Sequence, residues 1–474
     1  MLGVRVAVIT ESFLPHVDGV TNTVCRVLEH LRDRGHETMV VAPAPAPAAR
    51  RTAPRAHAGA PVLWAPSAPM PGYPAFRFAV PWPALPAALR EFDPDIVHLA
   101  APAGLGAQAV FAARRLDVPS VAVYQTDIAA FAARYGLATA ERTIWRWLAT
   151  VHRLAARTLA PSWDSVDALL RQGVQRVARW SRGVDLERFD PGHRDADLRR
   201  QLAPGGELLV GYVGRLAREK RVDLLGAVAD LPGTRLVVVG DGPSRLALTR
   251  TLPDAAFLGF RSGRELSAAV ASLDVFVHTG VHETFCQAAQ EAKASGVPVV
   301  APAAGGLLDV VEHGRTGLHY APGDPAALRA QVAALVSDPQ RRATMALAAR
   351  DSVAGCGWSA VGDELLGHYR DVLGTGGGQT ARRGGQAGHR AGPGAHGAHG
   401  GRGAHGGHRE IGARGGPDGR AGTPGRPGPG GWAARHLQAG SGGGARRGSG
   451  AAGWPPATGA GGRDAARRDD RRSP

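Results

Sequence analysis

The fold of this chain is constrained most by a repeated alternation of short apolar runs with stretches of helical composition. The runs VRVAVIT (4–10), DIVHLA (95–100) and SVAVYQT (120–126) are rich in apolar residues, and a helix-compatible stretch follows each of them. A second series of apolar runs, again alternating with helix-compatible stretches, lies at 207–215, 235–242, 255–260, 274–279 and 298–303. Valine-rich strands that alternate with helices are typical of parallel sheets covered on both faces. The sequence therefore predicts an α/β protein with two doubly wound, Rossmann-like domains that face a cleft.

The domain boundaries follow from changes in composition. The segment 188–206 is polar and is punctuated by proline and glycine, so we place the first domain at 1–190 and the second at 191–357. An amphipathic stretch at 358–374 is expected to return to the first domain as a helix. The segment 376–474 is rich in glycine, arginine and histidine and poor in apolar residues, a composition that predicts a disordered tail.

The formal net charge of +15 is concentrated in that tail, which carries +11 and leaves +4 for the rest of the chain. The predicted domains are thus only mildly basic, and we do not expect nucleic acid as their partner. Two interpretations of the tail stay open. It is either a non-functional extension or an arginine- and histidine-rich arm that binds anionic lipid or RNA.

The cysteines and the absence of long apolar runs predict a cytoplasmic protein, with at most a peripheral membrane contact. Cys25, Cys286 and Cys356 are too few and too scattered for a disulfide framework or a zinc motif, which favours the reducing cytoplasm. The amino terminus does not resemble a secretory signal. No uncharged apolar run approaches the roughly 20 residues that span a bilayer, so any membrane association is expected to be peripheral.

Two glutamates mark one candidate site, in the segment HETFCQAAQEAKASG (282–296). We expect a helix to begin near Phe285, so that Glu283 projects from the preceding turn and Glu291 lies about two turns into the helix. Free N–H groups at 284–287 would form an anion site that suits a phosphorylated sugar. The alternative is a helix-dipole partner at Glu283 and a solvated Glu291.

A second segment, GYVGRLAREKRVDLL (211–225), adds two cations at a strand end. Gly214 lets the backbone turn closely, and Arg215 and Lys220 follow, a pair that can neutralise a diphosphate. The alternative is a pair of ordinary surface cations. A third segment, VVVGDGPSR (237–245), lacks the G-x-G-x-x-G spacing, and we interpret it as a turn rather than a dinucleotide fingerprint.

Residues 1–374 resemble the retaining glycosyltransferases of family 4, which have the two-domain GT-B architecture. The resemblance is carried by Glu283 with Glu291 and by VGRLAREK, VVGDGP, RGVDLERFDP and ITESFLPHVDGVTNTV. Within the family, FLPHVDGVTNTV, FDPDIVHLA and VYQTD are most similar to the actinobacterial GDP-mannose-dependent α-mannosyltransferases that act on glycolipids. This similarity implies a hexosyltransferase that moves mannose from GDP-mannose to a lipid-linked or glycolipid acceptor.

The resemblance also implies roles for single residues. Arg215, Lys220 and Gly214 would hold the nucleotide diphosphate, Glu291 the ribose, and Glu283 the transferred hexose. The other implied site residues are the main-chain amides of Phe285 and Cys286, the loop residue Gly19, and Gln125 and Asp127 facing the cleft. The chain departs from many relatives at two of these positions, with Gln125 in place of a histidine and Cys286 in place of a glycine.

The family type needs no metal and no cofactor, with fixed cations in place of an ion. Two D-x-D matches, at 93–95 and 195–197, are interpreted as solvated turn residues. A glycolipid acceptor would require contact with the inner membrane leaflet, at the cytoplasmic face of the plasma membrane. Two segments bear on this: 141–160, an amphipathic helix with tryptophans and arginines, and 57–83, a proline-rich aromatic loop.

Rival functions remain. A UDP-sugar donor with a small-molecule acceptor would use the same kind of site, and an epimerase or a phosphorylase of similar architecture would differ in acceptor. A nicotinamide oxidoreductase needs a glycine fingerprint after the first strand, where this chain reads ESFLPHVDG. An RNA-binding function would depend on the tail alone.

Overall fold

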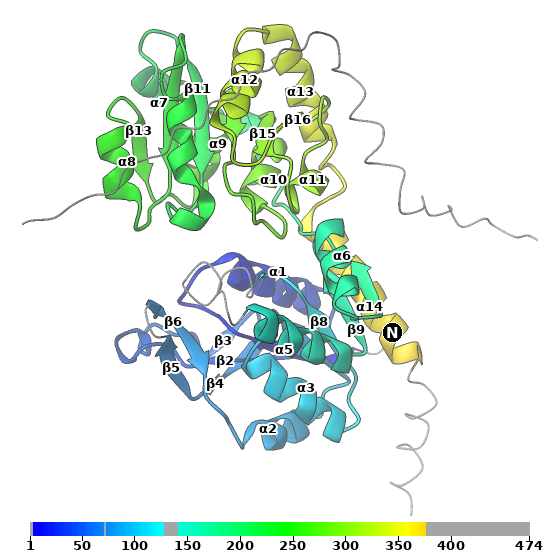
Figure 1. Cartoon of the computed structure of the whole chain (residues 1–474). Helices are drawn as coiled ribbons and strands as arrows, with labels where there is room; N and C mark the ends of the chain where they lie inside the picture. Colours follow the sequence, from blue (N-terminus) through cyan, green and yellow to red (C-terminus); the bar gives the residue numbers. More distant parts are fainter. Residues whose placement is uncertain (1–2, 71–72, 128–140, 376–474) are drawn as a thin grey trace, which may run out of the picture. The chain divides into compact units, whose positions relative to one another are not determined.

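The computed structural model describes residues 3–70, 73–127 and 141–375 (Figure 1). The predicted tail, 376–474, lies outside the described residues. The first sheet has the strand order β10-β9-β8-β7-β1-β2-β4-β3, and all its neighbours are parallel except β3 and β4. Its strands are β1 (Arg5–Thr10), β2 (Glu37–Pro43), β3 (Ala56–His57), β4 (Ala60–Ala65), β7 (Ile96–Ala100), β8 (Ser120–Val123), β9 (Arg157–Ala160) and β10 (Val177–Arg179).

The second sheet is wholly parallel and has the order β13-β12-β11-β14-β15-β16. Its strands are β11 (Leu208–Val213), β12 (Thr234–Val239), β13 (Ala256–Gly259), β14 (Val275–Val277), β15 (Val299–Pro302) and β16 (Gly317–Tyr320). The chain winds outward in one direction from β11 and then in the other from β14. The carboxyl ends of these two adjacent strands are therefore the topological switch point, where sheets of this type bind ligands.

Helices alternate with the strands in both sheets, as the apolar pattern predicts. Around the first sheet they are α1 (Gly19–Asp33), α2 (Leu85–Phe92), α3 (Leu105–Arg115), α5 (Glu141–Leu154), α6 (Trp163–Arg171) and α14 (Trp358–Thr375). Around the second they are α7 (Ala196–Leu202), α8 (Arg245–Thr251), α9 (Gly263–Ala271), α10 (Gln287–Ala294), α11 (Leu307–Val310), α12 (Pro325–Val336) and α13 (Pro339–Asp351). No helix among the described residues is long and apolar enough to cross a membrane.

Local sequence explains where several helices begin. Asp18 caps α1, because its side chain accepts a hydrogen bond from the amide of Thr21. Asp324 caps α12 in the same way, and Pro325 occupies the first turn, where its missing N–H costs nothing. The capped start of α1 fixes the loop between β1 and α1, which leads directly into Gly19, the first residue of the helix.

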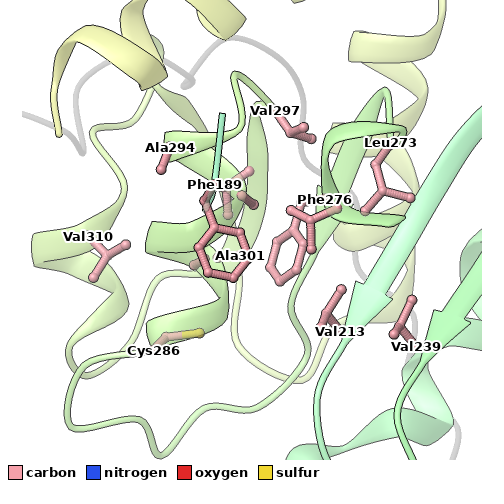
Figure 2. Close-up of a cluster of buried hydrophobic side chains, with 14 of the residues drawn as sticks. Phe189, Val213, Val239, Leu273, Phe276, Cys286, Ala294, Val297, Ala301 and Val310 are labelled. Atoms are coloured by element: carbon pink, nitrogen blue, oxygen red, sulfur yellow. The ribbon is translucent and has the colours of Figure 1, made fainter. Parts of the chain in front are cut away.

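Each sheet is packed between apolar clusters. The valines of the strands are almost entirely buried, as expected for sheets covered on both faces. Figure 2 shows one cluster of the second sheet, in which Cys286 lies among the apolar side chains. Val184 and Phe189 belong to the same cluster, so the chain has already entered the second core at these residues.

The last helix, α14, packs against α1 and completes the core of the first sheet. Val361, Leu365 and Val372 are buried there with Val6 and Val8 of β1. The hydroxyl group of Tyr369 forms a 2.7 Å hydrogen bond with Nδ1 of His98 on β7. The first core is thus built from the amino-terminal part of the chain and from α14. The whole second sheet lies between these two parts in the sequence.

The sequence-based assignment is wrong in three places. Between the runs at 207–215 and 235–242, where the alternation predicts a helix, the structure has a 3₁₀ segment, Val222–Val228, after a shorter one at Arg218–Lys220. The loop expected at 57–83 contains β4 and the paired strands β5 (Ser67–Met70) and β6 (Tyr73–Ala79). The short strands β9, β10 and β16 were not anticipated, because three or four residues are too few to show a periodic pattern.

Candidate functional site

The candidate site lies at the switch point, where the segment after β11 and the turn after β14 meet. Close backbone packing supports the first of these segments. A Cβ on Gly240 would lie 2.0 Å from the carbonyl oxygen of Gly214, and the Leu216 amide donates to the Asp241 carbonyl. The glycines of VVVGDG therefore let the turn after β12 support the segment that carries Arg215 and Lys220. This agrees with their interpretation as turn residues.

A buried ionic cluster joins the two segments. Lys220 Nζ donates to Glu283 Oε1 at 2.5 Å, and His278 Nε2 lies 3.0 Å from the same oxygen. The hydroxyl group of Thr279 donates to the Lys220 carbonyl, which ties the backbones together as well. We call Lys220, His278 and Glu283 the switch-point triad. The sequence predicts that Lys220 and Glu283 bind the same donor, and it gives no role to His278.

The pKa values within the triad are shifted by burial and by its own charges. Burial alone would raise the pKa of Glu283, but the charge of Lys220 and the hydrogen bond from His278 outweigh it and hold this pKa well below its usual value. Burial acts to lower the pKa of Lys220, yet Glu283 raises it overall. Glu283 is therefore a carboxylate at neutral pH and Lys220 is an ammonium group. The two side chains are paired with each other and are only 13% and 29% exposed, so neither projects freely into solvent.

Arg215 lies on the segment that carries Lys220, five residues before it. Its Nη1 atom is 3.4 Å from Oε1 of Glu219, a carboxylate that is itself almost buried. The Arg215 carbonyl accepts a hydrogen bond from the hydroxyl of Tyr212, one of the largest fully buried side chains. The base of the arginine is thus held by the core of the second sheet, and its guanidinium group remains about one-third exposed.

Helix α10 begins later than expected. Its first residue is Gln287 and not Phe285, and the residue before it, Cys286, has a positive φ of 91°. The predicted anion site at 284–287 therefore shifts, because only amides from Gln287 onward belong to the first turn. No side chain caps this turn, so its first amides are not satisfied within the helix. Phe285 and Cys286 are both buried in the core below the turn.

Glu291 lies about one turn into α10 rather than two. Burial raises its pKa to about 7, although the nearby charge of Arg188 and a hydrogen bond from Gln287 oppose this shift. Gln287 in turn donates from Nε2 to the carbonyl of Gly183. Glu291 is thus partly buried, in surroundings that raise its pKa toward neutrality.

The predicted residues of the first domain surround Arg182. The carbonyl of Gly19 accepts a hydrogen bond from Arg182 Nη1 at 3.3 Å, and the side chain of Gln125 accepts one from Nη2 at 3.3 Å. The main-chain carbonyl of Gln125 also accepts a 2.8 Å hydrogen bond from the hydroxyl of Thr284, beside Glu283. Asp127 follows two residues later and, after burial itself, is the main group that raises the pKa of Tyr124.

The structure brings together two sets of predicted residues. One set contains Lys220, Glu283 and the start of α10, and the other contains Gly19 and Gln125, linked through Thr284 and Arg182. Two participants were missed, His278 and Arg182. Each gave a signal in the sequence, since His278 is the polar residue that ends the run DVFVH and Arg182 begins the motif RGVD.

The two D-x-D matches have structural partners. Asp95 accepts a hydrogen bond from the amide of Arg5, and Asp195 caps α7 by accepting from the amides of Asp197 and Leu198. Within 3–70, 73–127 and 141–375, no group of three or more histidine, cysteine or acidic residues could hold a metal ion.

The fold matches solved structures over nearly their whole length. Sucrose-phosphate synthase from Thermosynechococcus elongatus aligns with a TM-score of 0.64 at 21% identity, covering 78% of this chain and 99% of that one. Anabaena Alr3699/HepE in complex with UDP aligns with a TM-score of 0.63 at 20% identity, covering 77% and 100%. These likenesses, with two Rossmann-like sheets and a site at a switch point, define the class as the GT-B fold.

Sequence comparison identifies the family. The model described as Glycosyltransferase Family 4 matches residues 17–188, and the one described as Glycosyl transferases group 1 matches residues 193–352. A GDP-mannose-dependent alpha-mannosyltransferase of Mycobacterium tuberculosis is 52% identical over 375 residues, covering 79% of this chain and 98% of the relative. One of Corynebacterium glutamicum is 44% identical, covering 78% and 89%. The chain belongs to glycosyltransferase family 4.

Proposed function

We propose that the protein transfers mannose from GDP-mannose, with retention of anomeric configuration, to a hydroxyl group of a glycolipid or lipid-linked acceptor. The observation that carries this proposal is the triad with Arg215 at the switch point, in a chain similar to mannosyltransferases over nearly their whole length. Two cations and a carboxylate in one place match the two halves of a sugar nucleotide. The cations suit its diphosphate, and the carboxylate suits the hydroxyl groups of its hexose.

The diphosphate would lie between Arg215, Lys220 and the first turn of α10. Arginine supplies a forked donor and lysine a compact charge, and both form strong charge-assisted hydrogen bonds with phosphate oxygens. The uncapped amides at the start of α10, with the adjoining amides of Phe285 and Cys286, would add neutral donors. Gly214 would allow the backbone to approach the phosphates closely.

The carboxylates would bind the two sugars of the donor. Glu283 would accept hydrogen bonds from the hexose, and Glu291 would accept them from the ribose hydroxyls. On the first-domain side, Gly19, Gln125 and Asp127 would face the reacting end of the donor and the acceptor. This arrangement is supported by the hydrogen bond between Thr284 and Gln125, which joins the two groups of residues.

The chemistry requires stabilisation of a departing anion. Breaking the bond to the nucleoside diphosphate leaves an oxocarbenium-like hexose, as in glycoside hydrolysis. Arg215, Lys220 and the start of α10 would stabilise the negative charge that grows on the leaving phosphate. We assign no side chain as general base, and the departing phosphate is itself a suitable acceptor for the proton of the acceptor hydroxyl.

A lipid acceptor would bring the first domain to a membrane surface. Trp147 of α5 and Trp163 of α6 are 46% and 57% exposed, and Phe111 of α3 is also exposed. Leu148 and Val151 bury one side of α5 against the first sheet, and Trp147 lies at the edge of that side, where its Nε1 donates to the Ala103 carbonyl. The exposed tryptophan and arginines of α5 support a peripheral contact with anionic lipid.

The donor is tested by comparing GDP-mannose, UDP-glucose and UDP-N-acetylglucosamine, with a membrane lipid extract as acceptor. We expect transfer and slow donor hydrolysis with GDP-mannose alone, and a glycolipid product that is sensitive to an α-mannosidase. Turnover of a UDP-sugar in preference to GDP-mannose would contradict the proposed donor. A water-soluble product with no labelled lipid would contradict the proposed acceptor.

Glu291 gives a pH-dependent prediction for stability. Its folded-state pKa of about 7 lies above the ordinary value of 4.5, so between these values the folded state holds a proton that the unfolded state has lost. The free energy of unfolding therefore falls as the pH rises through this window. Glu291→Gln should be more stable than wild type at pH 8, by on the order of 1–2 kcal/mol, and similar to it at pH 4.5.

Denaturant unfolding of both proteins at pH 4.5 and 8, without donor, measures this difference. Glu265→Gln, at an exposed position on α9, serves as the control and should show no such dependence. If the free energy of unfolding of Glu291→Gln differed from that of the wild type by the same amount at both pH values, burial would not raise the pKa of Glu291.

A further inference from the structure

His278 is the member of the switch-point triad that the proposed function leaves without a role. It follows directly after β14, where its amide donates to the Val300 carbonyl and its own carbonyl accepts from the hydroxyl of Tyr320. Its ring is stacked on that of Tyr212, with 6.1 Å between centroids and 15° between planes. The side chain is only about 4% exposed. The imidazole is therefore held in one position by the core of the second sheet.

The ring of His278 orients the carboxylate of Glu283 through a hydrogen bond to one of its oxygens, Oε1. Nε2 of His278 and Nζ of Lys220 both lie within hydrogen-bonding distance of Oε1. No hydrogen bond to Oε2 occurs among the described residues, so this oxygen remains available. Two donors from two different segments, one rigid ring and one flexible chain, fix the plane and direction of the carboxylate. Lys220 alone could not do so, because its long side chain has several rotatable bonds.

Gly280 shows how tightly this arrangement is packed. A Cβ at that position would lie 3.1 Å from His278 Nε2, 3.2 Å from Glu283 Oε1 and 3.4 Å from the Cα atom of Lys220. The turn thus closely approaches all three members of the triad, and a side chain at position 280 would require its neighbours to shift. The contact between His278 and Glu283 is direct and has little room to vary.

We propose that His278 is a positioning residue, which holds Glu283 so that Oε2 faces the hexose of the donor and which adds a buried positive charge beside the diphosphate. This inference rests on the proposed function, because it takes Glu283 as the residue that binds the hexose. It assigns to the second domain a histidine that acts through another residue and does not itself touch the substrate.

The charge on the ring follows from its surroundings. Burial would lower the pKa of His278, but the Cys286 side chain and the Glu283 carboxylate outweigh it and raise this pKa to about 9. Lys220 and Tyr212 also lie close to the ring, and the Tyr320 hydroxyl donates to the His278 carbonyl from β16. With His278 protonated, two cations surround one carboxylate, and the triad carries a net positive charge that favours an incoming diphosphate.

Two variants separate positioning from simple packing. His278→Gln keeps an amide donor near the place of Nε2 but cannot be charged, and His278→Leu fills the space without a donor. His152→Gln is the control, since His152 is equally buried in the first domain and is hydrogen-bonded to Thr158. For each protein, kcat and KM for the donor, the dissociation constant of GDP and the thermal midpoint are measured between pH 6 and 10.

We expect His278→Leu to lower kcat about 100-fold, since a misdirected carboxylate costs roughly this much. His278→Gln should recover about tenfold of that loss, and the affinity for GDP should change less than threefold in both. In the wild type, kcat/KM should fall as the pH rises through about 9, and this fall should be absent in His278→Gln. His152→Gln should keep the wild-type kcat and pH profile.

A His278→Leu protein with wild-type kcat and only a lower thermal midpoint would overturn the inference. So would an unchanged alkaline fall of kcat/KM in His278→Gln. The measurements use whichever donor the wild type turns over, so a preference for a UDP-sugar would contradict the proposed donor without deciding the role of His278. Independently of turnover, the ¹⁵N shifts of the His278 ring should show a protonated imidazole at pH 7.5 in the wild type and a neutral one in Glu283→Ala.

Discussion

Glu283→Ala should reduce kcat for mannosyl transfer by about 1000-fold or more, while the affinity for GDP changes only a fewfold. The carboxylate would contact the hexose and not the nucleotide, so its loss removes an interaction that matters most as the sugar separates from the diphosphate. Removal of Glu283 also leaves the Lys220 ammonium group without its carboxylate partner, beside a His278 ring that should then be neutral. We therefore expect a lower thermal midpoint in addition to the loss of activity.

Single-turnover kinetics and GDP titration at pH 7.5 distinguish these effects. Glu283→Gln retains the shape and one acceptor oxygen, and it should recover part of the stability but little of the turnover. Glu312→Ala is a suitable control, because Glu312 lies in the same domain and its exposed carboxylate pairs with Arg315 at the surface. If Glu283→Ala turned over at the wild-type rate, the hexose would have to be bound elsewhere.

Lys220→Ala should weaken GDP binding about 100-fold, which corresponds to about 2.7 kcal/mol at 25 °C. Lys220 would contribute a charge-assisted hydrogen bond to the diphosphate, and its removal takes one of the two fixed cations from the site. It also leaves Glu283 with one fewer partner, so the pKa of this carboxyl should rise toward its usual value. The loss should appear in both KM and kcat.

Calorimetric titration with GDP and with GMP tests this assignment. GMP carries a single phosphate, so the Lys220→Ala substitution should cost it less than it costs GDP. Arg218→Ala is the matched control, since Arg218 is an exposed cation in the same 3₁₀ segment. Equal losses for Arg218→Ala and Lys220→Ala would indicate a general effect of charge and would contradict a specific phosphate contact.

Much of the architecture could be predicted because parallel strands buried on both faces give strong local signals. The runs at 4–10, 95–100, 207–215 and 235–242 are continuous and apolar, and each contains a strand in the structure. The family was also evident from short motifs whose spacing is set by strand ends and turns. Both features depend on residues close together in the sequence.

The geometry of the site was less accessible, because it depends on contacts between distant residues. Nothing in the spacing indicates that His278 and Lys220 share one oxygen of Glu283, since these segments are joined only by the sheet. The start of α10 was misplaced because Cys286 has a positive φ, which composition does not reveal for a residue other than glycine. Arg182 had no identifiable partner until the backbone of Gln125 was placed beside it.

The position of α14 has a consequence for biosynthesis. Domains tend to fold as they leave the ribosome, beginning with the amino-terminal one. Here the amino-terminal core remains incomplete until Tyr369 and its neighbours have been synthesised, by which time every strand of the second sheet has already emerged. The second domain can therefore complete its core first, and the apolar side of the first sheet that α14 covers stays exposed until this helix has emerged.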